Sequence, residues 1–222
     1  MENVTRLRAV VFDFDGTLAR PTLDFALMKR RIGELGADYP CGRAEPGPLP
    51  ALEWIERLAG GMDEEPAGSF RREAHAIIEE MEAEAAMRTS LFGFTRPILA
   101  GLRRVGVAPA VITRNTRASV ATVFPDAGEY LSVLLTREDV DAVKPDPAHL
   151  LAALGGLGVG PEAALMVGDP PLDVLTARRA GAFAAAVASG ESDVKTLADT
   201  GPDFLAAHAG ELVERLAAEG WI

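Results

Sequence analysis

The chain has 222 residues, of which 48% are hydrophobic and 25% are charged, and its formal net charge is −11. This composition is typical of globular proteins and excludes a chain that is disordered throughout. The acidic balance disfavours a nucleic-acid binder, and the single cysteine, Cys41, excludes an internal disulfide framework.

Five short apolar runs predict buried strands. They are Ala9–Phe14, Pro109–Thr113, Tyr130–Leu135, Ala164–Gly168 and Ala182–Val187. Helical stretches lie between most of these runs, and this alternation predicts an α/β fold with a Rossmann-like parallel sheet that is covered on both faces. The alanine-rich tail, Asp203–Ile222, predicts a last helix.

The segment between the first two strands is far longer than the dozen or so residues that a crossover needs. Two stretches within it carry apolar side chains at helical spacing. The first has Phe25, Met28, Ile32 and Leu35, and the second has Phe70, Ala74, Ile77, Ile78, Met81 and Ala85. We therefore expect an inserted α-helical subdomain, with an irregular loop at Tyr39–Pro50 and a return hinge at Leu91–Phe94.

The run Asp13-Phe-Asp-Gly-Thr17 ends the first predicted strand. Strand periodicity places Asp13 and Asp15 on the same side, although the turn at Gly16 can aim Asp15 elsewhere. Two neighbouring carboxylates repel each other and favour a divalent cation such as Mg²⁺, and a carboxylate can also act as a nucleophile. A solvated turn explains the pair equally well when it is considered alone.

Three further features also have simple structural explanations when each is considered alone. Thr113 ends the second strand, where a hydroxyl either helps to bind an anion or caps a helix. Lys144, which precedes Pro145, is either a partner for phosphate or a surface lysine. Asp169 and Asp173 either serve a cation site or complement a helix dipole.

The order of these four features changes the interpretation. Strand ends at one edge of a parallel sheet converge in space, so an acid pair, a hydroxyl, a lysine and a second acid pair can share one pocket. Such a set of groups suits a phosphate bound beside Mg²⁺.

The combination resembles the haloacid dehalogenase superfamily, whose members are mostly phosphatases, and in particular its phosphoglycolate phosphatase-like branch with a helical cap. The resemblance covers nearly the whole chain. It implies a core domain formed by residues 1–18 and 95–222 and a cap subdomain formed by residues 19–94.

The resemblance also implies catalytic and metal-binding roles. Asp13 would be the nucleophile that carries a phosphoaspartate, and Asp15 would be the general acid and then the general base. Mg²⁺ would be bound by Asp13, the backbone carbonyl of Asp15 and Asp169, with Asp173 supporting the site.

The phosphate site follows from the same resemblance. Gly16, Thr113 and the backbone N–H of Arg114 would bind phosphate oxygens, and Lys144 would stabilise both Asp13 and the phosphoryl charge. The chain departs from the branch where Pro170 and Pro171 follow Asp169, because a Ser or Thr often stands there.

We expect a Mg²⁺-dependent phosphatase whose partner is a small phosphorylated metabolite, either phosphoglycolate-like or a sugar phosphate. The alternatives are a phosphomutase or phosphotransferase on a sugar phosphate, and a catalytically silent binding module. The retained carboxylates and Lys144 argue against a module without catalytic activity. Asp15 argues against C–halogen hydrolysis, because dehalogenases of the superfamily lack this second carboxylate. The run Lys29–Arg31 either binds an anionic substrate or forms a solvated helix face.

No apolar run is long enough to cross a bilayer, and the N-terminal sequence lacks the pattern of a signal peptide. We therefore expect a cytoplasmic protein that does not act at a membrane.

Overall fold

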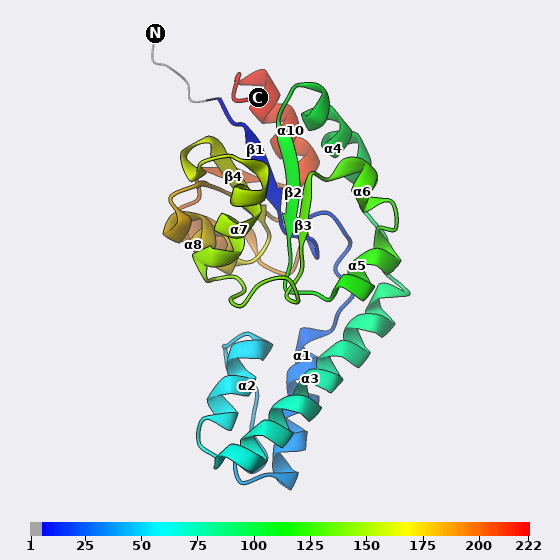
Figure 1. Ribbon diagram of the computed structural model, residues 1–222, viewed down its shortest axis with the longest axis vertical. Helices are drawn as coiled ribbons and strands as arrows, with labels where there is room; N and C mark the ends of the chain where they lie inside the picture. Colours follow the sequence, from blue (N-terminus) through cyan, green and yellow to red (C-terminus); the bar gives the residue numbers. More distant parts are fainter. Residues whose placement is uncertain (1–5) are drawn as a thin grey trace. The chain divides into compact units, whose positions relative to one another are not determined.

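The computed structural model describes residues 6–222, which form one parallel β-sheet, a set of helices packed on it and a separate helical unit (Figure 1). The strands have the spatial order β3-β2-β1-β4-β5-β6, and every neighbouring pair is parallel. Their bounds are Ala9–Phe12 (β1), Ala108–Ile112 (β2), Val133–Leu135 (β3), Ala164–Gly168 (β4), Phe183–Val187 (β5) and Phe204–Ala206 (β6). The predicted α/β architecture is confirmed.

The sheet is buried on both faces because alternate residues of each strand enter different apolar clusters. In β1, Val10 and Phe12 belong to one cluster, whereas Ala9 and Val11 belong to the other. All four are fully buried, and burial of a side chain the size of Phe12 contributes about 1.5–3 kcal/mol. This two-sided burial explains why the strands read as continuous apolar runs.

Helices cover each face of the sheet, and Figure 1 shows α4 and α10 on one side and α7 and α8 on the other. The first face is covered by α4 (Thr95–Arg104), α5 (Arg117–Val123), α6 (Ala127–Tyr130) and α10 (Ala209–Ala218). The second face is covered by α7 (Pro147–Leu157), α8 (Pro171–Ala180) and α9 (Val194–Asp199). A short 3₁₀ helix at Pro161–Ala163 leads into β4.

Helices α7 and α8 illustrate how local sequence sets the helix ends. Asp146 caps α7 by accepting a hydrogen bond from the N–H of Ala148, and Pro147 occupies the first helical turn. Both helices end at a glycine with positive φ, 65° at Gly158 and 77° at Gly181. These ends fix where each chain segment re-enters the sheet.

Internal contacts divide the described chain into two units. One contains the sheet and consists of the chain up to Pro21 together with Thr89–Ile222, and the other is Thr22–Arg88. The second unit comprises α1 (Phe25–Leu35), a 3₁₀ helix at Gly36–Asp38, α2 (Ala51–Ala59) and α3 (Glu64–Ala86). It is a helical bundle, as predicted, and Tyr39–Pro50 contains no helix or strand.

The bundle has its own apolar core. Helix α1 contributes Met28 and Ile32, and the other two helices contribute Trp54, Ile55, Phe70, Ala74 and Ile78. Most of the periodic apolar residues predicted for the two longer helices therefore meet within this unit, whereas Phe25 is exposed.

The chain leaves the sheet-containing unit and returns to it along two adjacent segments. Ala19 and Leu91 form an antiparallel bridge. The N–H of Arg20 donates to the carbonyl of Ser90 at 2.9 Å, and the N–H of Phe92 donates to the carbonyl of Leu18 at 3.0 Å. These bonds make a short two-stranded stem.

The predicted C-terminal helix is wrong over its first residues. Phe204–Ala206 forms the edge strand β6, which pairs with Ala185–Val187, and the helix α10 begins only at Ala209. A strand of three residues is too short to show a period of two, so the surrounding alanine-rich sequence led to the prediction of a helix. Within residues 6–222, no helix combines the length and the apolar character that crossing a bilayer requires.

Candidate active site

The predicted acid pairs meet at the carboxyl edge of the sheet. Strands β1 and β4 are hydrogen-bonded neighbours, and the N–H of Asp13 donates to the carbonyl of Val167 at 2.8 Å. Asp169 follows β4 directly, and Asp173 lies in the first turn of α8. The topology therefore brings together polar side chains that are distant in sequence, such as Thr17 and Asp169, which lie 152 residues apart.

Lys144 is the central cation of the cluster. Its Nζ lies 2.8 Å from Asp13 Oδ1 and 2.8 Å from Asp173 Oδ1, and its side chain is only 1% exposed. Burial alone would lower the pKa of Lys144, but the charges of Asp13 and Asp173 outweigh it and raise that pKa. The lysine is therefore held in its charged form.

Asp173 is fully buried beneath this lysine. The ammonium of Lys144, 2.8 Å from Asp173 Oδ1, is the charged partner of this carboxylate. Burial raises the pKa of Asp173 well above its ordinary value, and the charge of Lys144 opposes that rise. A Cβ added at Gly168 would lie 1.7 Å from Asp173 Oδ2, so only glycine fits beside this carboxylate.

Asp169 is enclosed by two loops. Thr17 Oγ1 donates to Asp169 Oδ1 at 3.2 Å. A Cβ added at Gly16 or at Gly190 would lie 2.6 Å or 1.8 Å from the Asp169 carboxylate. Burial and then the charge of Asp13 raise the pKa of Asp169 to about 7. Without a compensating cation, this carboxylate is thus poorly stabilised in its ionised form.

Asp15 lies at the edge of the same cluster and is half-buried. Burial and the charge of Asp13 raise the pKa of Asp15 to about 6, although a hydrogen bond from Asn115 opposes this shift. Asn115 Nδ2 donates to Asp15 Oδ2 at 3.0 Å. A carboxyl group that titrates near neutral pH is suited to exchanging protons.

The loop that follows β2 contacts the carboxylate cluster through Asn115, which is hydrogen-bonded to Asp15. Thr113 is buried, and its Oγ1 accepts a hydrogen bond from the N–H of Asn115 at 3.0 Å. The helix cap at this position is Thr116 rather than Thr113, because α5 begins at Arg117. The carbonyl of Arg114 accepts a hydrogen bond from Arg137 Nη1 at 2.9 Å.

Several residues of the site carried no role in the sequence-based prediction. Thr17 and Asn115 lie inside the motif segments, and their polar side chains were the available signal. Ser189 follows β5 and donates to the carbonyl of Gly16 at 2.7 Å, which no sequence pattern revealed. His149 is fully buried beside Lys144, whose N–H donates to its Nδ1 at 3.4 Å. Burial and the charge of Lys144 lower the pKa of His149 to about 4.

The donor set suits a divalent cation. Asp13, Asp15, Asp169 and Asp173 place four carboxylates around one lysine, and two of those carboxylates have strongly raised pKa values. No group of three His, Cys, Asp or Glu side chains in residues 6–222 forms a metal cage by itself. The ligand set implied by the family resemblance uses two carboxylates and one backbone carbonyl, and hard oxygen donors of this kind are those that Mg²⁺ accepts together with water.

Two side chains of the basic run Lys29–Arg31 in the helical unit have partners within that unit. Lys29 Nζ donates to the carbonyls of Gly47 and Leu49 at 2.9 and 3.3 Å, and Arg31 pairs with Glu80 at 2.7 Å. These two side chains therefore have structural partners within their own unit.

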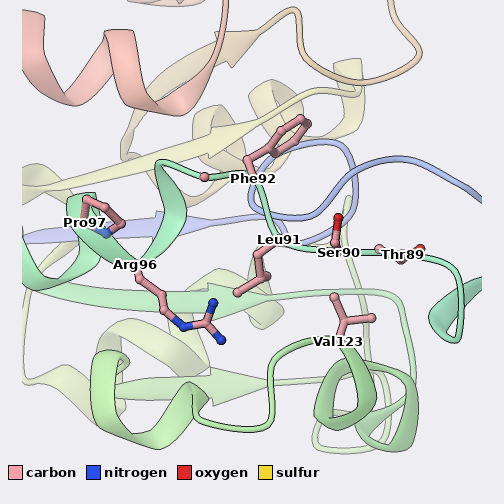
Figure 2. A pocket seen from close by; sticks show the side chains of 8 residues that line it. Thr89, Ser90, Leu91, Phe92, Arg96, Pro97 and Val123 are labelled. Carbon is pink, nitrogen blue, oxygen red and sulfur yellow. The ribbon is translucent and has the colours of Figure 1, made fainter.

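A cavity of about 450 Å³ lies in the sheet-containing unit and has no lining residue in common with the acidic cluster. Figure 2 shows Leu91, Arg96 and Val123 pointing toward one another at this cavity. The Arg96 guanidinium is already bound by both carboxylate oxygens of Asp126, at 2.8 and 2.6 Å. The candidate active site is therefore the carboxylate cluster rather than this cavity.

Comparison with known proteins identifies relatives of this chain. The family described as haloacid dehalogenase-like hydrolase matches residues 7–181. Phosphoglycolate phosphatase 1 of Pseudomonas aeruginosa is 31% identical over 214 residues, which cover 90% of this chain and 77% of that protein.

Solved structures share the fold. A Bacteroides fragilis protein described as a haloacid dehalogenase-like hydrolase has a TM-score of 0.70 and 26% identity, covering 93% of this chain and all of the other. A Thermotoga maritima protein described as a β-phosphoglucomutase has a TM-score of 0.63 and 22% identity, covering 96% of this chain and 99% of the other. At that lower identity the likeness concerns the fold alone.

Proposed function

Because the chain belongs to the haloacid dehalogenase-like hydrolase family, we propose that it is a Mg²⁺-dependent phosphatase that hydrolyses a small phosphomonoester through a phosphoaspartate on Asp13. The observation that carries this proposal is the position of Lys144, whose ammonium lies 2.8 Å from both Asp13 and Asp173. The similarity to a phosphoglycolate phosphatase supports phosphoglycolate or a substrate of comparable size.

Asp13 is suited to act as the nucleophile because one of its oxygens is held firmly. Oδ1 accepts the N–H of Phe14 at 2.7 Å and faces Lys144. These contacts fix the plane of the carboxylate and so orient its other oxygen. Attack on phosphorus forms a bond between Asp13 and phosphorus and breaks the bond between phosphorus and the substrate oxygen.

Asp15 supplies the proton transfers. With a pKa of about 6, it is available in both protonation states near neutral pH. It gives a proton to the leaving alcohol, and it then takes one from the water that hydrolyses the phosphoaspartate.

The remaining groups hold the phosphate. Thr113 and the N–H of Arg114 bind phosphate oxygens, with Gly16 on the opposite loop, and Lys144 offsets the phosphoryl charge. Asp13, Asp169 and the carbonyl of Asp15 would bind Mg²⁺, with Asp173 behind them. Bound there, the cation supplies positive charge to the phosphoryl oxygens.

The test is release of inorganic phosphate from a panel of phosphorylated metabolites by wild type and by Asp13→Asn. We expect the variant to lose activity by about 10³-fold or more, because an amide cannot form the acyl phosphate. Asp146→Asn is the matched control, since Asp146 caps α7 and an asparagine caps equally well. Activity of Asp13→Asn equal to that of the control contradicts the covalent mechanism.

The same panel separates the alternatives. A phosphomutase would isomerise a sugar phosphate and release little phosphate, and a binding module would release none. Phosphate release that requires Mg²⁺ is the result that supports the phosphatase.

A further inference from the structure

The loop that follows β2 sends a side chain to the proposed proton donor. Asn115 lies 100 residues from Asp15 in sequence, and its Nδ2 donates to Asp15 Oδ2 at 3.0 Å. Asn115 is only 9% exposed. A buried polar side chain of this kind is held by its own hydrogen bonds.

The orientation of the Asn115 amide is set at its other end. Its Oδ1 accepts the backbone N–H of Thr116 at 2.7 Å. A backbone N–H can only donate, so the oxygen of the amide must face Thr116 and the nitrogen must face Asp15. The backbone N–H of Asn115 is fixed as well, because it donates to Thr113 Oγ1 at 3.0 Å.

This arrangement distinguishes the two oxygens of Asp15. Oδ2 is occupied as an acceptor of the Asn115 N–H, so a proton on Asp15 sits on Oδ1. The amide therefore selects one oxygen for proton exchange and holds the carboxyl group in one orientation.

On the basis of the function proposed above, we propose that Asn115 is a positioning residue that orients Asp15 for proton transfer to the leaving group. In that step the bond from phosphorus to the substrate oxygen breaks, and the proton moves from Asp15 Oδ1 to that oxygen. Asn115 itself touches neither the substrate nor phosphorus.

The dependence on the leaving group tests this role. An alkoxide is a poor leaving group and needs the proton, whereas 4-nitrophenolate leaves without one. The specificity constant kcat/KM reports the chemistry up to the first irreversible step, here release of the alcohol or phenol. Correct general acid catalysis is worth about 10²–10⁴-fold, so misplacing the acid affects mainly the alkyl substrate.

The experiment compares Asn115→Ala with wild type on the best alkyl phosphate of the panel and on 4-nitrophenyl phosphate. We expect kcat/KM to fall by about 10²-fold for the alkyl phosphate and to stay within about threefold for the aryl phosphate. Equal losses on both substrates would overturn the inference, because they would indicate general damage to the site.

A double-mutant cycle makes the test specific to Asp15. If Asn115 acts through Asp15, adding Asn115→Ala to Asp15→Ala causes no further loss on the alkyl phosphate. Additive losses would show that Asn115 acts independently, which contradicts the proposal.

Two controls keep the outcomes distinct. If Asn115→Ala does not fold, Asn115→Ser carries the same test, because a hydroxyl remains near the Thr116 N–H but is too short to reach Asp15. A wild-type chain that releases no phosphate from any substrate refutes the proposed function, and this inference falls with it. An active wild type with no leaving-group selectivity in the variants refutes the inference alone.

Discussion

Replacing the buried lysine with an uncharged side chain of similar length is the most direct perturbation of the acidic cluster. Lys144→Met removes both 2.8 Å ion pairs, with Asp13 and Asp173, from a site where the lysine is 1% exposed. At an effective dielectric constant of about 20, each pair is attractive by about 6 kcal/mol. Desolvation of the charges offsets much of this attraction, and removal of one partner from a buried pair typically costs about 3–5 kcal/mol.

A loss of that size is a large part of the stability of a domain, which is usually about 5–15 kcal/mol. For a chain of this length it corresponds to a decrease in Tm of about 6–20 °C. The loss should be largest at pH 8 and smaller near pH 5. The pKa values of Asp15 and Asp169, about 6 and about 7, are already raised, so these carboxyls take up protons as the pH falls and their repulsion weakens.

The assay is urea unfolding of wild type and Lys144→Met between pH 5 and pH 8, with EDTA present so that no bound cation replaces the lysine. Lys195→Met is the matched control, because the Lys195 side chain is 87% exposed and its ammonium forms a surface ion pair with Asp199 at 3.3 Å. We expect the control to leave the midpoint unchanged. An unchanged midpoint for Lys144→Met at pH 8 would refute the reasoning that this lysine neutralises the carboxylates.

Three other measurements address neighbouring features. His149→Gln should flatten the pH dependence of stability, because the pKa of His149 is about 4 instead of 6.5. Protonation of this histidine opposes folding by about 3 kcal/mol as the pH falls through this range. An equal pH dependence of the free energy of unfolding in urea titrations of both proteins contradicts this. Gly16→Ala should cost about 1–3 kcal/mol and much of the activity, because φ is 75° and a Cβ would meet Asp169 at 2.6 Å. Gly181→Ala has a similar φ of 77° but open space, so an equal loss in thermal melts of the two variants shows that the contact does not matter. Adding Mg²⁺ to EDTA-treated protein should raise Tm more at pH 8 than at pH 5.5, because protons compete for Asp169; a shift that persists in Asp169→Asn places the cation elsewhere.

The sheet was predictable from sequence because its strands are buried on both faces. Five of the six described strands read as short apolar runs, and the run at Ala164–Gly168 matches β4 residue for residue. The sixth, Phe204–Ala206, pairs with one neighbour only and is too short to leave a pattern. Helices α2 and α4 carried no specific prediction, although α2 places Trp54, Ile55 and Leu58 at helical spacing.

The convergence of the acid pairs was predictable for a different reason. In a parallel sheet, residues that follow strands gather at one edge whatever their distance along the chain. The contacts of Asn115 and Ser189 were not predictable, because they depend on how particular loops turn after β2 and β5. Loop conformation follows from tertiary packing, which a single sequence does not display.

The stem formed by Ala19 and Leu91 marks the point in the sequence where the helical unit is inserted into the unit that carries the carboxylate cluster. Arg20 and Ser90 are hydrogen-bonded neighbours at 2.9 Å, so a tight reverse turn could join them and leave an uninterrupted strand-and-helix framework. Any peptide whose two ends lie equally close together can be grafted at this point without disturbing the residues at the sheet edge. An exchange of the insert at this junction would therefore leave Asp13, Lys144 and Asp173 in flanking segments that are unchanged.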